Sequence, residues 1–166
     1  NLCGNQLIGE IPLEIGDLVN LEYLFLFENN LSGEIPIGIG SLTNLIYLNL
    51  SHNQIYGQIP SEIGNLIYLR ELSLSENQLT GEIPSEIGDL TNLEYLILEN
   101  NQLTGQIPSE VCDLIESNNL WMDNILDGNN LINTCEEVSI CDGLTEVELW
   151  GVTYDIATTT YIDLYG

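Results

Sequence analysis

Leucine returns at fixed positions along the first 114 residues of the chain. Leu21, Leu24, Leu26, Asn29 and Leu31 define the pattern L-x-x-L-x-L-x-x-N-x-L. The pattern begins again every 24 residues, at Leu45, Leu69 and Leu93. Alternate residues of a strand point to opposite sides, so each copy predicts a short strand with leucines on its core side. Successive copies predict a parallel sheet.

A second motif, G-x-I-P, accounts for every proline in the chain. Its five copies share the 24-residue period without insertion or deletion and begin at Gly9, Gly33, Gly57, Gly81 and Gly105. Two interlocking motifs with one period predict a solenoid, in which each repeat stacks on the next and buries a continuous core.

Asparagine occupies one further position of every repeat. The five members are Asn5, Asn29, Asn53, Asn77 and Asn101. A short amide at an inward turn pairs with backbone groups that burial would otherwise leave unpaired. We therefore expect an asparagine ladder, which ends where Ile125 replaces the next asparagine.

The two motifs together resemble the plant-type extracellular leucine-rich repeats, which also occur in surface proteins of microbes and protists. The resemblance covers residues 1–114. It implies a leucine-rich-repeat solenoid, a right-handed superhelix with a parallel β-sheet on its concave face. It also implies that the G-x-I-P segments form a second, outer strand.

The repeat pattern decays after residue 114, which divides the chain into three predicted parts. Residues 1–114 hold the five repeats, residues 115–140 a final rung and a carboxyl-terminal cap, and residues 141–166 a segment of another kind. Cys112 stands where earlier repeats have glycine, and we expect it to pair with Cys135 and staple the cap. Disulfides form in oxidising compartments, so an extracellular or cell-surface location is expected.

The last segment resembles the amino-terminal cap of plant-type repeats. It contains Trp150-Gly151-Val152-Thr153-Tyr154-Asp155, with Tyr154 where that family usually has cysteine. A cap-like head at the carboxyl end would lead into a following repeat block or a neighbouring copy. The residues predicted to form the two assembly ends are Leu2, Cys3, Leu7, Trp150, Tyr154, Ile162 and Leu164.

The cysteine spacing is consistent with such an assembly. Cys3 and Cys112 lie 109 residues apart in sequence, or about 4.5 repeats and about 22 Å at the spacing of parallel strands. A disulfide requires Cα atoms within about 7 Å. Cys3 is therefore free or pairs with a neighbouring unit, for which Cys141 is the first choice; the alternative is a partner upstream of this segment.

The charge balance is extreme, with 26 acidic residues, one arginine, no lysine and a net charge of −25. Nucleic acids and anionic membrane surfaces attract basic proteins, so both are excluded as partners. No run of about 18 apolar residues predicts insertion into a membrane. Glu62, Glu86 and Glu110 share one repeat position. On neighbouring rungs of a parallel sheet they would lie about 4.8 Å apart and repel one another, so we expect loosely bound Ca²⁺ along them. The alternative is a solvated acidic surface.

No dedicated metal site or cofactor is predicted. The acidic stretch from Asp123 to Asn130 lacks the alternating ligand spacing of a calcium loop and indicates a turn. The single histidine, His52, is expected on the outward side of a strand, where no carboxylate would orient it for catalysis. Two neighbouring carboxylates such as Glu71 and Glu94 resemble a glycosidase pair, but such pairs arise by chance on so acidic a surface. We therefore expect no enzymatic activity.

The outward positions of the predicted strands form the candidate binding face. They are aromatic or polar and include Tyr23, Phe25, Phe27, Tyr47, Asn49, Glu71 and Tyr95. Exposed aromatic residues on a concave sheet predict recognition of a peptide or a glycan. The alternative is that they stiffen the sheet, because aromatic residues favour strands. Asn30 and Asn49 also begin N-x-S glycosylation sequons.

Two functions follow from these observations. The first is an extracellular scaffold whose units assemble head to tail into a fibre or a long tandem array. The alternative is a ligand-binding ectodomain that recognises a peptide or a glycan on its concave face.

Overall fold

The leucine pattern forms one strand per repeat in a four-stranded parallel sheet, here called the concave sheet. The computed structural model describes residues 1–135, 146–149 and 152–155. The concave sheet has the order β2-β4-β6-β8. Its strands are β2 (Tyr23–Phe25), β4 (Tyr47–Asn49), β6 (Glu71–Ser73) and β8 (Tyr95–Ile97). Their register is 24 residues, with Leu24 opposite Leu48 and Leu48 opposite Leu72, as the sequence predicts.

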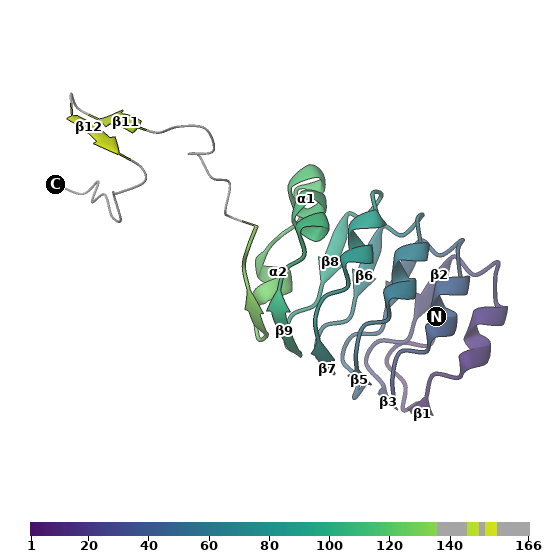
Figure 1. Ribbon diagram of the computed structural model, residues 1–166. Helices are drawn as coiled ribbons and strands as arrows, with labels where there is room; N and C mark the ends of the chain where they lie inside the picture. Colours follow the sequence, from purple (N-terminus) through teal and green to yellow (C-terminus); the bar gives the residue numbers. More distant parts are fainter. Residues whose placement is uncertain (136–145, 150–151, 156–166) are drawn as a thin grey trace. The chain divides into compact units, whose positions relative to one another are not determined.

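Outer strands lie at or next to the glycine of each G-x-I-P motif, which confirms the second strand. One sheet pairs β1 (Ile8–Glu10) with β3 (Asn30–Ser32) in parallel. The other has the order β10-β9-β7-β5, formed by β5 (Tyr56–Gly57), β7 (Gln78–Gly81), β9 (Gln102–Gln106) and β10 (Asn130–Ile132). Figure 1 shows these outer strands following one another along the solenoid.

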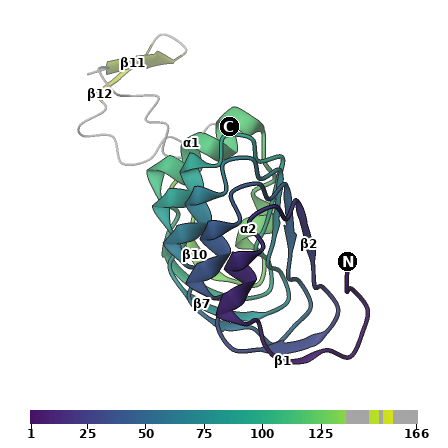
Figure 2. The same cartoon turned by 90° about the vertical axis from the view of Figure 1, so that its right-hand side faces the viewer.

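The proline of each motif then starts a helix. Pro36, for example, is the extended N-cap residue of such a helix, with φ −68° and ψ 139°, and its carbonyl accepts the backbone N–H of Ile39. A proline is tolerated there because its missing N–H is not needed by the helix. The resulting 3₁₀ helices are η1 (Leu13–Asp17), η2 (Ile37–Ser41), η3 (Ser61–Asn65) and η4 (Ser85–Asp89). The α-helix α1 (Ser109–Asn118) contacts η4 and continues the row, which Figure 2 shows end on.

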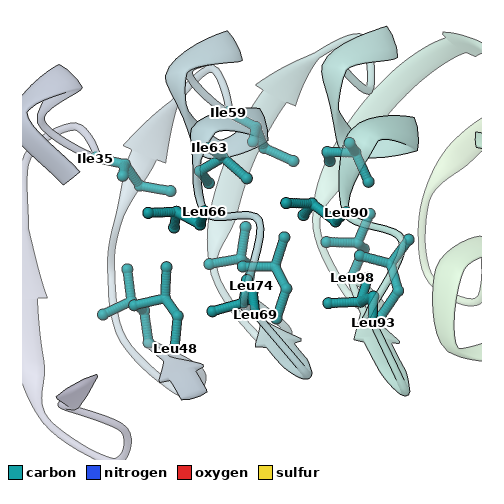
Figure 3. Close-up of a cluster of buried hydrophobic side chains, with 14 of the residues drawn as sticks. Ile35, Leu48, Ile59, Ile63, Leu66, Leu69, Leu74, Leu90, Leu93 and Leu98 are labelled. Carbon is teal, nitrogen blue, oxygen red and sulfur yellow. The ribbon is translucent and has the colours of Figure 1, made fainter. Parts of the chain in front are cut away.

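The hydrophobic core lies between the strands and this row of helices. Leu48 and Leu72 of the concave sheet and Ile63 of η3 are fully buried. Figure 3 shows the buried leucines and isoleucines pointing into the same layer from successive repeats. Leu24, in the first strand of the concave sheet, remains 7% exposed, because the segment on its amino-terminal side pairs with this rung only from Leu2 onward.

The asparagine ladder is confirmed and fixes the turns. The side-chain amide of Asn53 donates to the carbonyls of Leu26 and Leu50 at 3.0 Å, and its oxygen accepts the N–H of Leu31 at 3.0 Å. The same bonds recur at Asn29, Asn77 and Asn101, and Asn5 also donates to local backbone carbonyls. No buried polar side-chain atom among the described residues lacks a hydrogen-bond partner.

The expected end of the ladder at Ile125 was wrong. Ile125 is fully buried in the core, and Asn129 accepts the N–H of Leu103 in the place of a ladder asparagine. The short helix α2 (Asp123–Leu126) inserts four residues here and moves the asparagine from position 125 to 129. The turn predicted for Asp123–Asn130 is therefore the helix α2, a turn at residues 127–129, where Gly128 has φ +67°, and the start of β10 at Asn130.

The predicted disulfide between Cys112 and Cys135 is present, with Cα atoms 5.0 Å apart. It joins α1 to Cys135, which lies three residues after the end of β10. The chain divides into two units, Asn1–Cys135 and Glu136–Gly166. In the second unit, β11 (Glu146–Leu149) and β12 (Val152–Asp155) form an antiparallel pair with Glu146 opposite Asp155. No helix among the described residues is long and apolar enough to cross a bilayer.

Candidate ligand-binding face

The aromatic side chains of the concave sheet form one connected cluster on the first two rungs. The rings of Tyr23 and Tyr47 stack with centroids 5.6 Å apart and planes 9° apart. Phe25 contacts Tyr47 at 6.3 Å, and Phe27 meets Phe25 edge to face at 6.4 Å. Tyr23 is half exposed and the other three are partly exposed. This part of the face offers a broad aromatic surface to a ligand.

Polar residues lie beside Tyr47 on its own rung and on the next rung. Asn49 donates to Glu71 at 3.2 Å and accepts the hydroxyl of Ser51 at 2.7 Å. Ser51, Ser73 and Ser75 are buried although they belong to outward columns, because their side chains are shorter than those of their neighbours. The polar rungs therefore have short side chains between bulkier aromatic ones on either side.

Aromatic residues return at the carboxyl-terminal side of the sheet. Tyr95 is 55% exposed and Trp121 is 76% exposed. Both line a groove of about 500 Å³, together with Glu94, Asn118 and Asn119. Our sequence analysis missed Trp121, although it lies one 24-residue period after Ile97 and that spacing could have identified it.

The single arginine lies at the border of the concave face. Arg70 forms an ion pair with Glu94 at 3.3 Å, and both side chains are more than half exposed. The pair lies next to a groove of about 400 Å³ that Arg70 lines together with Glu22, Tyr68 and other residues. No other salt bridge is present among the residues that the structure describes.

A larger groove of about 1090 Å³ runs along the outer strands instead. Glycine, isoleucine, proline, threonine, serine and carboxylate or amide residues of the G-x-I-P region line it, and none of the lining residues is aromatic. The concave sheet, unlike this groove, presents aromatic side chains, which commonly dominate binding energy.

Two positional expectations from the sequence were wrong. Glu62 and Glu86 lie in η3 and η4, and Glu110 lies in α1, so they stack along the helical row and not along a sheet. No group of three acidic, histidine or cysteine side chains in the described part could hold a metal ion; loosely bound Ca²⁺ stays a prediction. His52 lies beyond β4 in a left-handed turn with φ +52°, a conformation shared by Glu28, Glu76 and Asn100.

The two sequons differ in their surroundings. Asn30 begins β3 and is exposed. Asn49 lies in the concave sheet, where its amide nitrogen donates to Glu71. Only Asn30 therefore presents an unengaged amide to solvent.

The predicted assembly ends are described only in part. Leu2 is 52% exposed, Leu7 packs against the core, and Cys3 is partly buried and has no disulfide partner among the described residues. Leu2 and Leu7 line an apolar cavity of about 390 Å³ at the amino-terminal rung. Tyr154 belongs to β12, whereas Cys141, Trp150, Ile162 and Leu164 lie outside the described residues.

Comparison with known proteins gives the family. Residues 13–120 match the family model of the "EGF-like domain-containing protein ComC LRR domain". A search of the curated proteins gave no match. Several solved structures from Arabidopsis thaliana are similar in both fold and sequence.

One of these is the BIR3–SERK2 complex, with 39% identity, a TM-score of 0.71 and coverage of 80% of this chain and 68% of that chain. The ectodomain of the receptor kinase SOBIR1 is 34% identical, with a TM-score of 0.70 and coverage of 79% of this chain and 69% of that chain. The HAESA ectodomain in complex with an IDA peptide hormone is 36% identical, with a TM-score of 0.70. The match covers 78% of this chain but only 25% of HAESA.

The family match and these ectodomains agree with the repeat geometry and with an extracellular or cell-surface location. The leucine-rich-repeat ectodomain is an interaction module that presents a surface to other molecules. The chain belongs to the extracellular leucine-rich-repeat family.

Proposed function

We propose that this chain is the ligand-binding region of an extracellular leucine-rich-repeat protein and that its concave sheet recognises a peptide or a glycan. The observation that carries the proposal is the aromatic cluster of Tyr23, Phe25, Phe27 and Tyr47. Its rings contact one another at 5.6–6.4 Å and remain partly exposed. Rigid aromatic side chains supply large contact areas at low entropic cost.

The similar structures support this function over a purely structural role. The HAESA ectodomain is in complex with a peptide hormone, and BIR3 is in complex with SERK2. These are properties of those proteins, and the shared repeat architecture is the reason to extend recognition to the present chain.

A binding screen with matched tyrosine variants tests the proposal. The chain is applied to peptide and glycan arrays, and affinities for the hits are measured with Tyr23→Ala, Tyr47→Ala and Tyr56→Ala. Tyr56 is 47% exposed but belongs to the outer strand β5, so it is the control. We expect about tenfold or greater loss for the two concave variants and none for the control. Equal loss in all three, or no loss, would contradict recognition on the concave sheet.

We propose head-to-tail self-association as a second function, favoured by the apolar amino-terminal rung. Ile8 is 81% exposed, Leu13 58% and Leu2 52%, and they lie around the cavity of about 390 Å³ or next to its lining. Such a face suits stacking against another rung. Sedimentation measurements on the wild-type chain and on Ile8→Glu test this: concentration-dependent assembly should disappear in the variant, and a wild-type monomer at all concentrations would refute self-association.

A further inference from the structure

The tyrosine column of the concave sheet is interrupted by one carboxylate. Tyr47, Glu71 and Tyr95 are direct register partners on the successive strands β4, β6 and β8. Tyr23 completes the column and covers one face of the Tyr47 ring. The other face of that ring is therefore left on the side of Glu71.

The space over Glu71, between Tyr47 and Tyr95 on the neighbouring strands, is here called the slot. Neighbouring parallel strands lie about 4.8 Å apart, so the backbones of Tyr47 and Tyr95 are separated by about 9.6 Å. A group placed midway is about 4.8 Å from each tyrosine position, and a cation interacts favourably with an aromatic ring within about 6 Å of its centroid. One side chain that lies over Glu71 is therefore within reach of both tyrosines.

Glu71 has no cationic partner among the described residues. Its side chain is partly buried, and its hydrogen bond is with the neutral amide of Asn49 at 3.2 Å. The chain's only arginine, Arg70, is paired with Glu94 at 3.3 Å. A partly buried carboxylate gains from a charged partner that accompanies it out of water.

The charge of the whole chain favours the same ligand. A net charge of −25 attracts cations and repels anions over a distance of several ångströms. The aromatic rings, the unpaired carboxylate and the overall field therefore all favour a positive group at one place.

We propose that the slot between Tyr47 and Tyr95 binds the cationic side chain, arginine or lysine, of a peptide ligand, with Glu71 as its charge partner. This inference rests on the proposed function of the concave sheet. It assigns Glu71 the role of a specificity-determining residue, because the carboxylate favours a cation over a neutral side chain of similar shape.

The direct test uses a minimal ligand. N-acetyl-arginine amide is titrated into the isotopically labelled chain and followed by NMR at Tyr47, Glu71 and Tyr95. N-acetyl-citrulline amide is the neutral analogue of nearly the same shape. We expect saturable shifts at these residues with the arginine compound and at least about fivefold weaker binding of the citrulline compound.

A matched pair of variants separates the slot from the general acidity of the surface. Glu71→Gln keeps an acceptor for Asn49 and removes one negative charge, while Glu86→Gln on η4 removes the same charge elsewhere. We expect about fivefold weaker arginine binding in the first and no change in the second. Equal effects of the two variants, or equal binding of citrulline, would overturn the proposal.

The array hits distinguish this inference from the proposed function. Hits that depend on Tyr47 but not on Glu71, including a neutral glycan, would preserve concave recognition and refute the cationic slot. Arginine binding that depends on both Glu71 and Tyr47, in a chain for which no array hit depends on Tyr23, would preserve the slot and refute the broader recognition surface.

Discussion

The side-chain oxygen of Asn129 accepts the backbone N–H of Leu103 at 3.1 Å. Leu103 is fully buried, so this N–H has no access to water. The amide of Asn129 also donates to the carbonyls of Leu98 and Ile125 at 2.9 and 3.0 Å. The last turn of the solenoid is thus satisfied by one residue that lies outside the 24-residue period.

Replacing Asn129 with alanine should lower the free energy of unfolding by about 2 kcal/mol, since it leaves buried backbone groups unpaired. Asn130 is adjacent and exposed, so Asn130→Ala should change the free energy by less than about 0.5 kcal/mol. Urea unfolding followed by circular dichroism measures both. Similar values for the two variants would show that the ladder bond at Asn129 is not stabilising.

The glycines of the 3₁₀ helices set the distance between successive repeats. A Cβ added at Gly64 would lie 2.6 Å from the backbone oxygen of Glu86 on the next rung. Gly64→Ala should therefore destabilise the chain by about 2 kcal/mol through overpacking. The exposed neighbour Asn65 provides the control variant Asn65→Ala, which should be nearly neutral. Thermal unfolding compares them, and an unchanged melting temperature for Gly64→Ala would mean that the rungs can separate without cost.

Loss of the Cys112–Cys135 disulfide should destabilise the carboxyl-terminal cap. The two cysteines are 23 residues apart in sequence, and closing a loop of this size stabilises by about 3 kcal/mol in the chain-entropy account. The double variant Cys112→Ser with Cys135→Ser should lose this amount in denaturant unfolding. Cys3→Ser should retain wild-type stability under conditions in which the chain is monomeric; a comparable loss there would indicate that Cys3 also has a stabilising partner.

The two sequons should differ when the chain is secreted from eukaryotic cells. We expect a glycan on Asn30, which is exposed, and none on Asn49 in the folded fraction, because a glycan would replace the bond between Asn49 and Glu71. Peptide mass spectrometry after enzymatic deglycosylation reads the occupancy of each site. Substantial occupancy of Asn49 in folded protein would contradict this reading of the concave sheet.

Much of the solenoid was predictable because its physical requirements recur in every repeat. The alternating leucines and the isoleucine of G-x-I-P fill the core, and the ladder asparagines pair with backbone groups at the turns. Each of these roles returns after 24 residues, so the five copies together predict a solenoid. The register of Tyr23 with Tyr47 and Glu71 follows directly from that period. The pairing of Cys112 with Cys135 was predictable because a solenoid end needs covering.

The remaining features depend on departures from the period. Asn129 joins the ladder because α2 lengthens this repeat by four residues, and no local sequence motif predicts that insertion. Glu62 was placed on a sheet because repeat position alone does not distinguish a strand from a 3₁₀ turn. Trp121 was missed because the leucine pattern weakens around it, although its column continues.

The asparagine ladder and the close glycine contacts have a consequence for how such a chain can change over generations. They fix the backbone of each rung without involving the outward side chains. Tyr47, Glu71 and Tyr95 can therefore be replaced by other residues one at a time while the backbone of the solenoid is kept. Duplication of one 24-residue repeat between β4 and β6 would insert a new row of outward residues and move Tyr47 about 4.8 Å farther from Glu71. The concave sheet is therefore a surface whose length and chemistry can be inherited separately.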